Sequence, residues 1–220
     1  MRRFVSLCAL FAALGTGTSE AIAQVHGHDG SVITGRTVGA NNDVLFFQAG
    51  WPGISASLIH GATPKVDLGG IFTFNYGFEG DVNAPVVPGL KLQGLLRANF
   101  TDSGKLNLGI NFAPGPLFYF FRGYPTVIGM DVPIGLAVGI RASPDVNVGL
   151  MFELPMFVVF GTSRYDGQLV LPILFGGGVE YFLERNLALT FTLKMGPMIY
   201  TASDFTDFDF QALFGLAVKL

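Results

Sequence analysis

The charged residues of this sequence stand singly between apolar residues, and those on one side of an alternating pattern are the first candidates for chemistry. They are Asp67, Lys91, Arg97, Lys105, Asp131, Arg141, Glu153, Glu180, Lys194, Asp209 and Lys219. An isolated charge inside a protein is costly unless an opposite charge or hydrogen bonds compensate it. We therefore expect these side chains to pair across an interior. The candidates for an ion-pair network at its middle are Arg97, Arg141, Glu153, Glu180 and Lys194.

Histidines are few and offer little for catalysis or metal binding. His26 and His28 are weak metal candidates, because two imidazoles and the carboxylate of Asp29 could share one ion. The alternative is a solvated linker, since the surrounding residues are polar and show no period. His60 stands alone and no histidine follows it, which argues against acid–base or triad chemistry. We expect no enzymatic activity and no cofactor.

The N-terminus has the pattern of a secretory signal peptide over residues 1–23. Two arginines precede an apolar run from Phe4 to Leu14, and Ala21-Ile22-Ala23 fits the small-residue cleavage rule. The run is too short to span a bilayer as a helix, which takes about 20 residues. The one cysteine, Cys8, falls within this signal, so we expect a mature chain without disulfides.

The rest of the chain is unusually apolar for a protein surrounded by water. Of the 220 residues, 13% are charged and 50% are hydrophobic, and the net charge is −3. A soluble surface carries about 25–35% charged residues. The mild acidity argues against nucleic acid as a partner, because phosphate binding needs a basic face. No stretch after the signal reads as a spanning helix, which leaves the closed β-barrel as the way into a membrane.

Alternation with period 2 runs through most of the chain and predicts strands. Residues 24–42 are the exception, being rich in Gly, His, Thr and Asn, and are expected to form a flexible periplasmic lead-in. From residue 43 to residue 220 the pattern predicts an all-β, closed, antiparallel up-and-down transmembrane barrel. Nine strands are clear and Val44–Ala49 supplies a tenth, so ten strands are expected, with eight as the alternative.

Short polar turns alternate with longer connections along this barrel region. The short turns lie at 61–64, 101–104, 143–145 and 183–186. The longer connections are predicted at 79–88, 113–129, 157–169 and 201–206. Short turns at one end and long loops at the other are typical of bacterial outer-membrane barrels.

The polar face of the predicted strands decides which side meets lipid. It is dominated by Gly, Ala, Thr and Asn with about one charge in each strand, which is too few charges for a solvated exterior. It suits a narrow, partly polar lumen, and the apolar face then lies in the bilayer. The lumen charges either form a structural ion-pair network in a closed barrel or line a gated pore. A soluble periplasmic barrel is the distant alternative.

This pattern resembles the small bacterial outer-membrane barrels of the outer membrane protein A, X and W type, within the porin-like superfamily. The resemblance covers the signal peptide and nearly all of residues 44–220, and the segment Gly215–Leu220 looks like the assembly signal of such barrels. It implies an outer-membrane location in a Gram-negative cell and Sec-dependent export. It also implies contact with lipids and lipopolysaccharide, the barrel-assembly machinery as a biogenesis partner, and a monomeric state.

Two functions remain open at this stage. One is a non-enzymatic structural or surface-interaction role, with a narrow polar lumen inside the barrel. The other is a small channel for passive uptake of small or apolar solutes. A continuous water path through the lumen would favour the channel, and a plugged lumen would favour the structural role.

Overall fold

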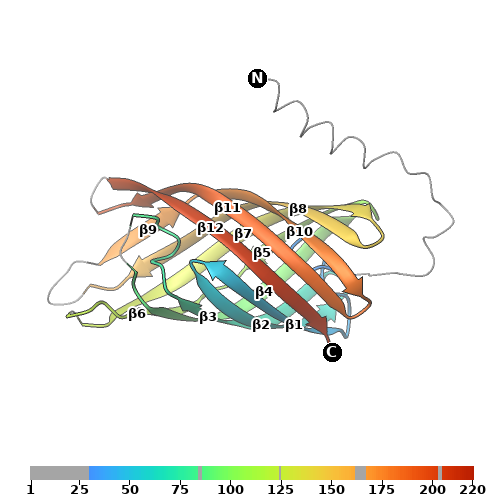
Figure 1. Ribbon diagram of the computed structural model, residues 1–220, viewed down its shortest axis with the longest axis horizontal. Coiled ribbons are helices and arrows are strands. Elements are labelled where there is room, and N and C mark those ends of the chain that lie inside the picture. The colour runs from blue at the N-terminus through green and yellow to red at the C-terminus, as the bar shows by residue number, and fades with distance from the viewer. Residues whose placement is uncertain (1–29, 84–85, 124, 162–166, 203–204) are drawn as a thin grey trace, which may run out of the picture.

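The structure is a computed structural model that describes residues 30–83, 86–123, 125–161, 167–202 and 205–220. These residues form a single twisted β-sheet rolled into a cylinder, with its strands tilted against the long axis (Figure 1). Within the described ranges, no helix is long and apolar enough to cross a membrane. The signal peptide predicted at residues 1–23 and the metal candidates His26 and His28 lie outside the described residues.

Twelve strand segments make up the sheet in the described part of the chain. They are β1 (Asp43–Trp51), β2 (Gly53–Thr63), β3 (Val66–Asn75), β4 (Gly89–Asp102), β5 (Leu106–Phe112), β6 (Gly115–Tyr119), β7 (Val127–Ser143), β8 (Val146–Val159), β9 (Gln168–Pro172), β10 (Leu174–Glu184), β11 (Leu187–Tyr200) and β12 (Phe205–Lys219).

These segments correspond to ten barrel strands, because two strands are interrupted. β5 and β6 both lie between β4 and β7, and they are separated only by Ala113 and Pro114. β9 and β10 both lie between β8 and β11, and they are separated only by Ile173. Proline has no N–H to donate to a ladder, which accounts for the first break. The predicted count of ten is confirmed.

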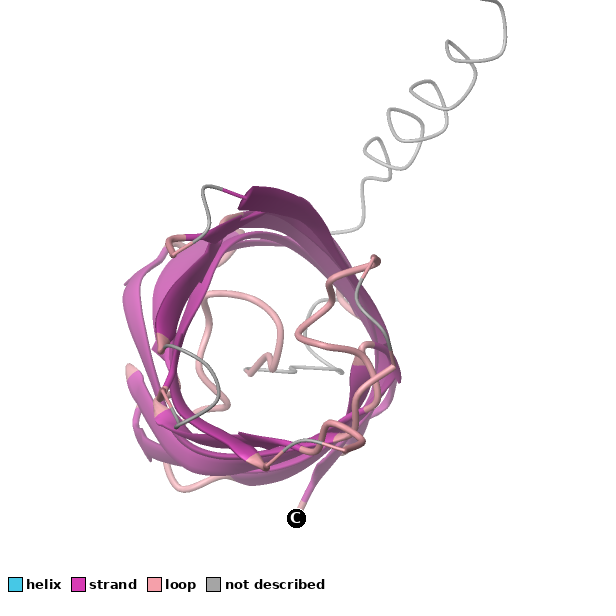
Figure 2. Ribbon diagram, turned by 90° about the vertical axis from the view of Figure 1, so that its left-hand side faces the viewer, coloured by secondary structure: helices cyan, strands magenta, loops and turns pink. Residues whose placement is uncertain are grey.

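The barrel closes where the first strand meets the last. β1 pairs antiparallel with β12 from Val44 opposite Lys219 to Trp51 opposite Ala212. Seen down its axis, the sheet forms a complete ring (Figure 2). Closure leaves every strand with two neighbours. The part of β12 that extends past Trp51 is met by the connection after β3, through an isolated bridge between Asp81 and Asp209. The predicted closed up-and-down barrel is confirmed, and β1 is the extra strand expected near Val44–Ala49.

The two ends of the barrel differ in their connections. At the end we call the short-turn end, four pairs of consecutive strands are joined by two or three residues each, at 64–65, 103–105, 144–145 and 185–186. At the opposite, long-loop end the longer connections run through 76–88, 120–126, 160–167 and 201–204. Three of these are shorter than the sequence predicted, because β6, β9 and the start of β12 extend the pairing into them. Both Asp43 and Lys219 lie at the short-turn end.

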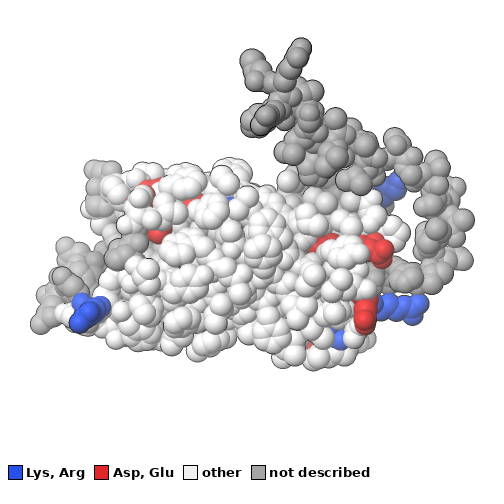
Figure 3. Space-filling model, viewed as in Figure 1, with Lys and Arg blue, Asp and Glu red and all other residues white. Residues whose placement is uncertain are grey.

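Outward-facing and inward-facing residues alternate along each strand. Large apolar side chains such as Phe214, Leu150 and Phe175 are 67%, 60% and 57% exposed on the outside. In the space-filling view the charged side chains gather toward the two ends and leave an uncharged belt between them (Figure 3). The buried polar and charged residues lie on the inner face instead, as Asp67 and Asp209 do at 0% exposure.

Near the long-loop end the interior is filled with apolar side chains. We call this cluster the apolar cap, and it consists of Val87, Leu117, Tyr119, Val127, Phe157, Val159, Val170 and Met198. Phe78, from the connection after β3, packs on it with its ring centroid 4.8 Å from that of Tyr119. The remaining interior contains the candidate site and is more polar, apart from a second apolar cluster in which Ile33 and Val38, from the segment before β1, pack with Val44, Phe46, Ile59, Ala188 and Ala217.

Candidate functional site

The segment before β1 lies inside the barrel at the short-turn end. We call residues 30–38 the plug. Ile33, Thr34, Arg36 and Val38 are each at most 7% exposed, which places the segment within the lumen. The sequence suggested a flexible periplasmic lead-in over 24–42, whereas residues 30–42 have a defined position here. The aperiodic, polar composition gave no sign of this, because the partners of the segment are distant in sequence.

The plug is a compact turn stabilised by its own hydroxyl groups. The Ser31 hydroxyl oxygen accepts hydrogen bonds from the N–H groups of Ile33 and Thr34 at 3.3 and 3.1 Å. The Thr34 hydroxyl accepts from the Arg36 N–H at 3.3 Å. The Ser31 N–H donates to the Thr37 carbonyl at 3.2 Å and closes the turn. Ser and Thr favour such local bonds to nearby N–H groups.

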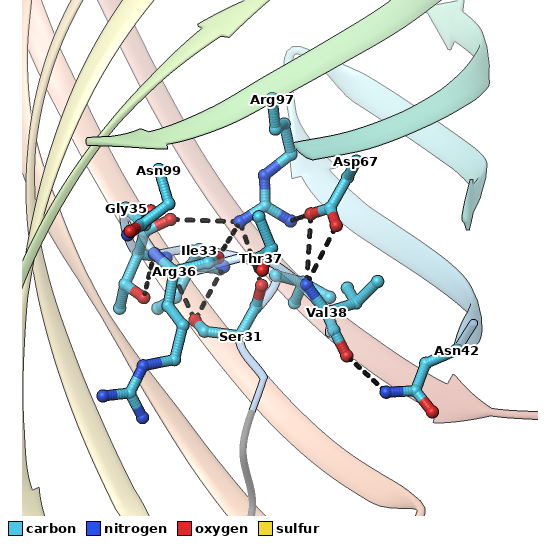
Figure 4. Close-up of polar contacts among 12 residues, drawn as sticks. Ser31, Ile33, Gly35, Arg36, Thr37, Val38, Asn42, Asp67, Arg97 and Asn99 are labelled. Atoms are coloured by element: carbon cyan, nitrogen blue, oxygen red, sulfur yellow. Dashed lines mark hydrogen bonds and ion pairs between the residues drawn. The ribbon is translucent and has the colours of Figure 1, made fainter. Parts of the chain in front are cut away.

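Arg97 on β4 is the main contact of the barrel wall with the plug (Figure 4). Its Nη2 donates to the carbonyl oxygens of Ser31, Thr34 and Arg36 at 2.9, 3.0 and 2.7 Å. Its Nη1 lies 3.3 Å from Oδ2 of Asp67, which stands directly opposite on β3. The turn is therefore built so that three carbonyl groups converge on one guanidinium.

Asp67, Asn99 and Glu180 also bind the plug from the barrel wall. We call these three side chains and Arg97 the cradle. The Asp67 carboxylate accepts from the Val38 N–H, with its two oxygens at 3.2 and 3.1 Å. The Asn99 side-chain amide donates to the Gly35 carbonyl at 2.7 Å. On the opposite wall, the Glu180 carboxylate accepts from the Val32 N–H at 3.0 Å. Together these side chains bind both the carbonyl and the N–H groups of the plug backbone.

Plug side chains in turn reach the short turns of the barrel. Arg36 Nη2 donates to the Gly104 carbonyl at 3.0 Å, and the Thr37 hydroxyl donates to the Pro64 carbonyl at 2.9 Å. Gly35 passes so close to β5 that a Cβ atom on it would lie 2.3 Å from the Gly109 nitrogen. Real Cβ atoms do not approach backbone so closely, so this position accepts only glycine.

A second polar cluster lies between the plug and the apolar cap. Lys91 Nζ is 2.5 Å from Oε2 of Glu79 and 2.9 Å from Oδ2 of Asp131. The Tyr119 hydroxyl donates to Oε1 of Glu79, and the Asn75 amide donates to the same oxygen at 3.3 Å. Glu79 belongs to the connection after β3, so this cluster ties that connection into the barrel.

The five residues predicted to pair at the middle of the lumen are brought together only in part. Lys194 Nζ lies 2.7 Å from Oε2 of Glu153, and both line the interior. Arg97 forms its ion pair with Asp67. Glu180 accepts hydrogen bonds from the Val32 N–H and, at 2.9 Å, from the Asn147 amide. Arg141 lies on β7 opposite Asn147.

The sequence did not reveal the partners around Lys91 and Arg97. Asp67, Lys91 and Asp131 stood among the expected lumen charges, but which of them meet depends on strand register and barrel tilt. Glu79 lay in a predicted loop and carried no signal of a lumen role. Its backbone adopts a positive φ of 51°, which turns the chain back into the barrel mouth.

The lumen between these clusters holds a chamber of about 270 Å³. Val32 and Ile33 of the plug line it at one end, and Glu79, Lys91 and Asp131 line it at the other. The plug therefore occupies one side of the chamber, and the apolar cap lies beyond the Lys91 cluster.

No group of three or more His, Cys, Asp or Glu side chains in the described ranges is arranged to hold a metal ion. His60 has a partner that the sequence did not reveal, since its Nδ1 lies 2.8 Å from Oδ1 of Asp43 at an exposed position of the short-turn end. The fold and the lumen define a closed ten-stranded β-barrel with an internal N-terminal plug. No protein-family model and no curated protein matches this chain.

Proposed function

We propose that this protein is a non-enzymatic integral barrel of the bacterial outer membrane, with a structural or surface-interaction role and a lumen that is closed at both ends. The observation that carries the proposal is the outer face of the barrel. Exposed Phe, Leu, Ile and Val side chains cover its middle, and the charged groups lie at the ends or inside (Figure 3). Such a belt is the surface that hydrocarbon solvates.

The backbone supports a membrane setting for the same reason. In lipid, each backbone N–H and C=O must be satisfied within the protein, and a closed barrel does this through its ladders. A barrel surrounded by water would instead place the charged residues outside, and this chain buries Asp67, Arg97 and Asp131. A water-exposed belt of this kind would also promote association between molecules.

The closed lumen favours a structural role over an open channel. The plug occupies most of the short-turn end, and the apolar cap occupies the long-loop end with Leu117, Tyr119 and Phe157 at 0% exposure. The chamber between them is the observation that favours the second candidate, a gated channel for small solutes, because a chamber between two closures suits an occluded state.

Enzymatic activity has no support in the lumen. His60 lies on the outer side of the short-turn end, and the lumen carboxylates Glu79 and Glu153 are engaged with Lys91 and Lys194. We propose that the protein's partners are outer-membrane lipid and lipopolysaccharide, together with the barrel-assembly machinery during biogenesis. We further propose that the barrel is monomeric, with nucleic acid excluded as a partner.

Expression in a Gram-negative host, followed by membrane fractionation, tests the location. The protein should appear in the outer-membrane fraction and migrate faster in gels before boiling than after it, as folded barrels do. Recovery in the soluble periplasmic fraction would refute the membrane proposal. Planar-bilayer recordings on the purified protein separate the two candidate functions, since steady conductance of the unmodified chain contradicts a closed structural barrel.

A further inference from the structure

We propose that the lumen wall at the short-turn end is a receptor site for a folded peptide turn, and that the plug is a resident ligand that can leave and be replaced in trans. The site is formed by Asp67, Arg97, Asn99 and Glu180. The ligand class is a peptide turn of the pattern Ser-x-x-Thr-Gly, as in residues 31–35. This inference rests on lumen contacts alone and does not depend on the membrane proposal.

The barrel is complete without the plug. Each barrel strand pairs with two neighbours, and β1 closes on β12 from Val44 onward. Among the described residues, no strand pairing involves residues 30–38. Departure of the plug therefore breaks none of the ladders that hold the cylinder together. Stability of the barrel and occupancy of the site are separable properties.

The wall side chains bind main-chain groups of the plug. Arg97 donates to three carbonyl oxygens, Asn99 donates to a fourth, and the carboxylates of Asp67 and Glu180 accept from two N–H groups. All peptides have these groups, so the polar side chains of the wall select a conformation that presents them together. Ile33 and Val38 of the plug add apolar packing, in one cluster with Phe46 and Ile59 of the wall. The Ser31 hydroxyl also interacts with the Glu180 carboxylate.

Two features of the plug sequence produce that conformation. The hydroxyl oxygens of Ser31 and Thr34 accept hydrogen bonds from N–H groups that follow them in the sequence. These bonds lie within the plug and stabilise the turn independently of the barrel wall. Gly35 permits the approach to β5 that brings its carbonyl within reach of Asn99. A peptide that has these three residues in this spacing, with apolar residues in place of Ile33 and Val38, therefore has the features that the site recognises.

The resident plug fills the site incompletely. A cavity of about 130 Å³ remains beside it, lined by Ser31, Val32 and Val38 on one side and by Glu180 and Phe182 on the other. The Asn107 Oδ1 atom, buried next to Thr34, has no hydrogen-bond partner among the described residues. Spare volume and spare hydrogen-bonding capacity leave room for a different peptide to fit as well as the resident one.

Exchange can be tested on the full chain. A protease recognition sequence is inserted between Ala40 and Asn41, which are exposed and outside the strands, so that the plug is cut from β1 only after folding. The cut protein is diluted in detergent, freed of released peptide, and titrated with a fluorescent peptide of residues 30–40 while anisotropy is recorded. The uncut chain serves as a control, because its tethered plug holds the site at an effective concentration of about millimolar.

We expect the cut barrel to release its plug and to bind the labelled peptide with a micromolar dissociation constant, while the uncut chain shows no binding at that concentration. Arg97→Met should weaken binding by roughly 100-fold, because charge-assisted hydrogen bonds to three carbonyls are lost. Arg122→Met is the matched control, since Arg122 is exposed at the opposite end, and it should change binding by less than about 2-fold.

Peptide variants distinguish a site that recognises this specific turn from a lumen that binds peptides nonspecifically. A peptide with Gly35→Val should fail to bind, because its new side chain would clash with the backbone of β5. One with Val32→Thr should bind within about 5-fold of the original, because it keeps the N–H bond to Glu180 and replaces a partly buried side chain by one of nearly the same size. The proposal is overturned if the plug stays bound after cutting and dilution, if the released barrel does not rebind the peptide, or if the Gly35→Val peptide binds as well as the original. None of these outcomes bears on the cellular location of the barrel.

Discussion

Asp67 and Arg97 face each other across the β3–β4 ladder, and their buried side chains hold the plug from two sides, one by its carbonyls and the other by an N–H group. The guanidinium of Arg97 is a planar, positively charged group with several N–H donors. The Asp67 carboxylate neutralises this positive charge and also accepts a hydrogen bond from the Val38 N–H. Neither residue could be replaced alone without leaving a buried charge uncompensated. The stability of the folded protein therefore depends on this pair.

Replacing Arg97 with Met should destabilise the folded protein strongly. The change removes the ion-pair partner of Asp67 and three hydrogen bonds to the plug, and loss of one member of a buried pair costs about 3–5 kcal/mol. Urea unfolding followed by the gel shift between folded and unfolded forms measures the loss. Arg122→Met should change the free energy of unfolding by less than about 0.5 kcal/mol. A loss below about 1 kcal/mol for Arg97→Met would contradict the structural importance of the pair.

Replacing Gly35 with Val should expel the plug while leaving the barrel folded. The new Cβ would meet the Gly109 nitrogen at 2.3 Å, and backbone on β5 cannot yield to it. Arg36 is only 7% exposed, so trypsin should spare the bond after it in the unmodified protein and cut there in the variant. Mass spectrometry of the digest is the readout. Gly94→Val, at an open position on β4, should leave the bond protected, and equal protection in both variants would speak against a clash.

Two buried aspartates should respond oppositely to the same isosteric change. Among the described residues, the Asp209 carboxylate has no ion pair and no hydrogen bond of good geometry, and only Gln211, Lys194 and Lys91 interact with it more weakly, whereas Asp131 Oδ2 is paired with Lys91. Asp209→Asn removes a buried charge that is only weakly compensated and should raise the free energy of unfolding by about 1 kcal/mol. Asp131→Asn weakens an existing ion pair and should lower it by about 2 kcal/mol or more. The urea concentration at the midpoint of unfolding, measured for both variants, tests this prediction. A loss of stability in the Asp209 variant would mean that a further group stabilises the Asp209 carboxylate.

Conductance should require removal of both closures of the lumen. Expelling the plug through Gly35→Val leaves the apolar cap in place, so bilayer recordings should stay near the baseline. Adding Phe157→Ala removes a large side chain from that cap, and discrete conductance steps should then appear. Phe157→Ala alone is the control that keeps the plug. Steps in the Gly35→Val variant alone would mean that the cap does not block the path.

The barrel itself was largely predictable from the sequence, because each strand carries its own local signal. Alternation marked the strands, and the spacing of polar turns marked the hairpins, which together gave ten strands. The register between strands joined by long loops had no such local signal. The pairing of Asp67 with Arg97 depends on how β3 and β4 align across residues 76–88, and neither composition nor period determines that alignment.

The plug could not be predicted, for a different physical reason. Its contacts run from its main chain to side chains 61 to 66 positions away on β4, and main-chain groups leave no mark in a sequence. A stretch rich in Gly, Ser and Thr without hydrophobic period also has the composition of a linker. Ser31, Thr34 and Gly35 carry the residue-specific requirements of the turn, and all three are residue types that such a stretch contains in any case.

The seam between β1 and β12 has a consequence for the order of assembly. The plug is joined to β1 through residues 39–42 alone, and β1 is one of the two strands whose meeting closes the cylinder. The plug is synthesised before the barrel strands. It must therefore already lie inside the barrel when β1 pairs with β12, or it must enter through the short-turn end afterwards. Four residues span at most about 14 Å, so the plug of an intact chain stays near the short-turn end of its own barrel. Each molecule therefore contains one plug and one site for it, and the plug directly precedes the strand that closes the barrel.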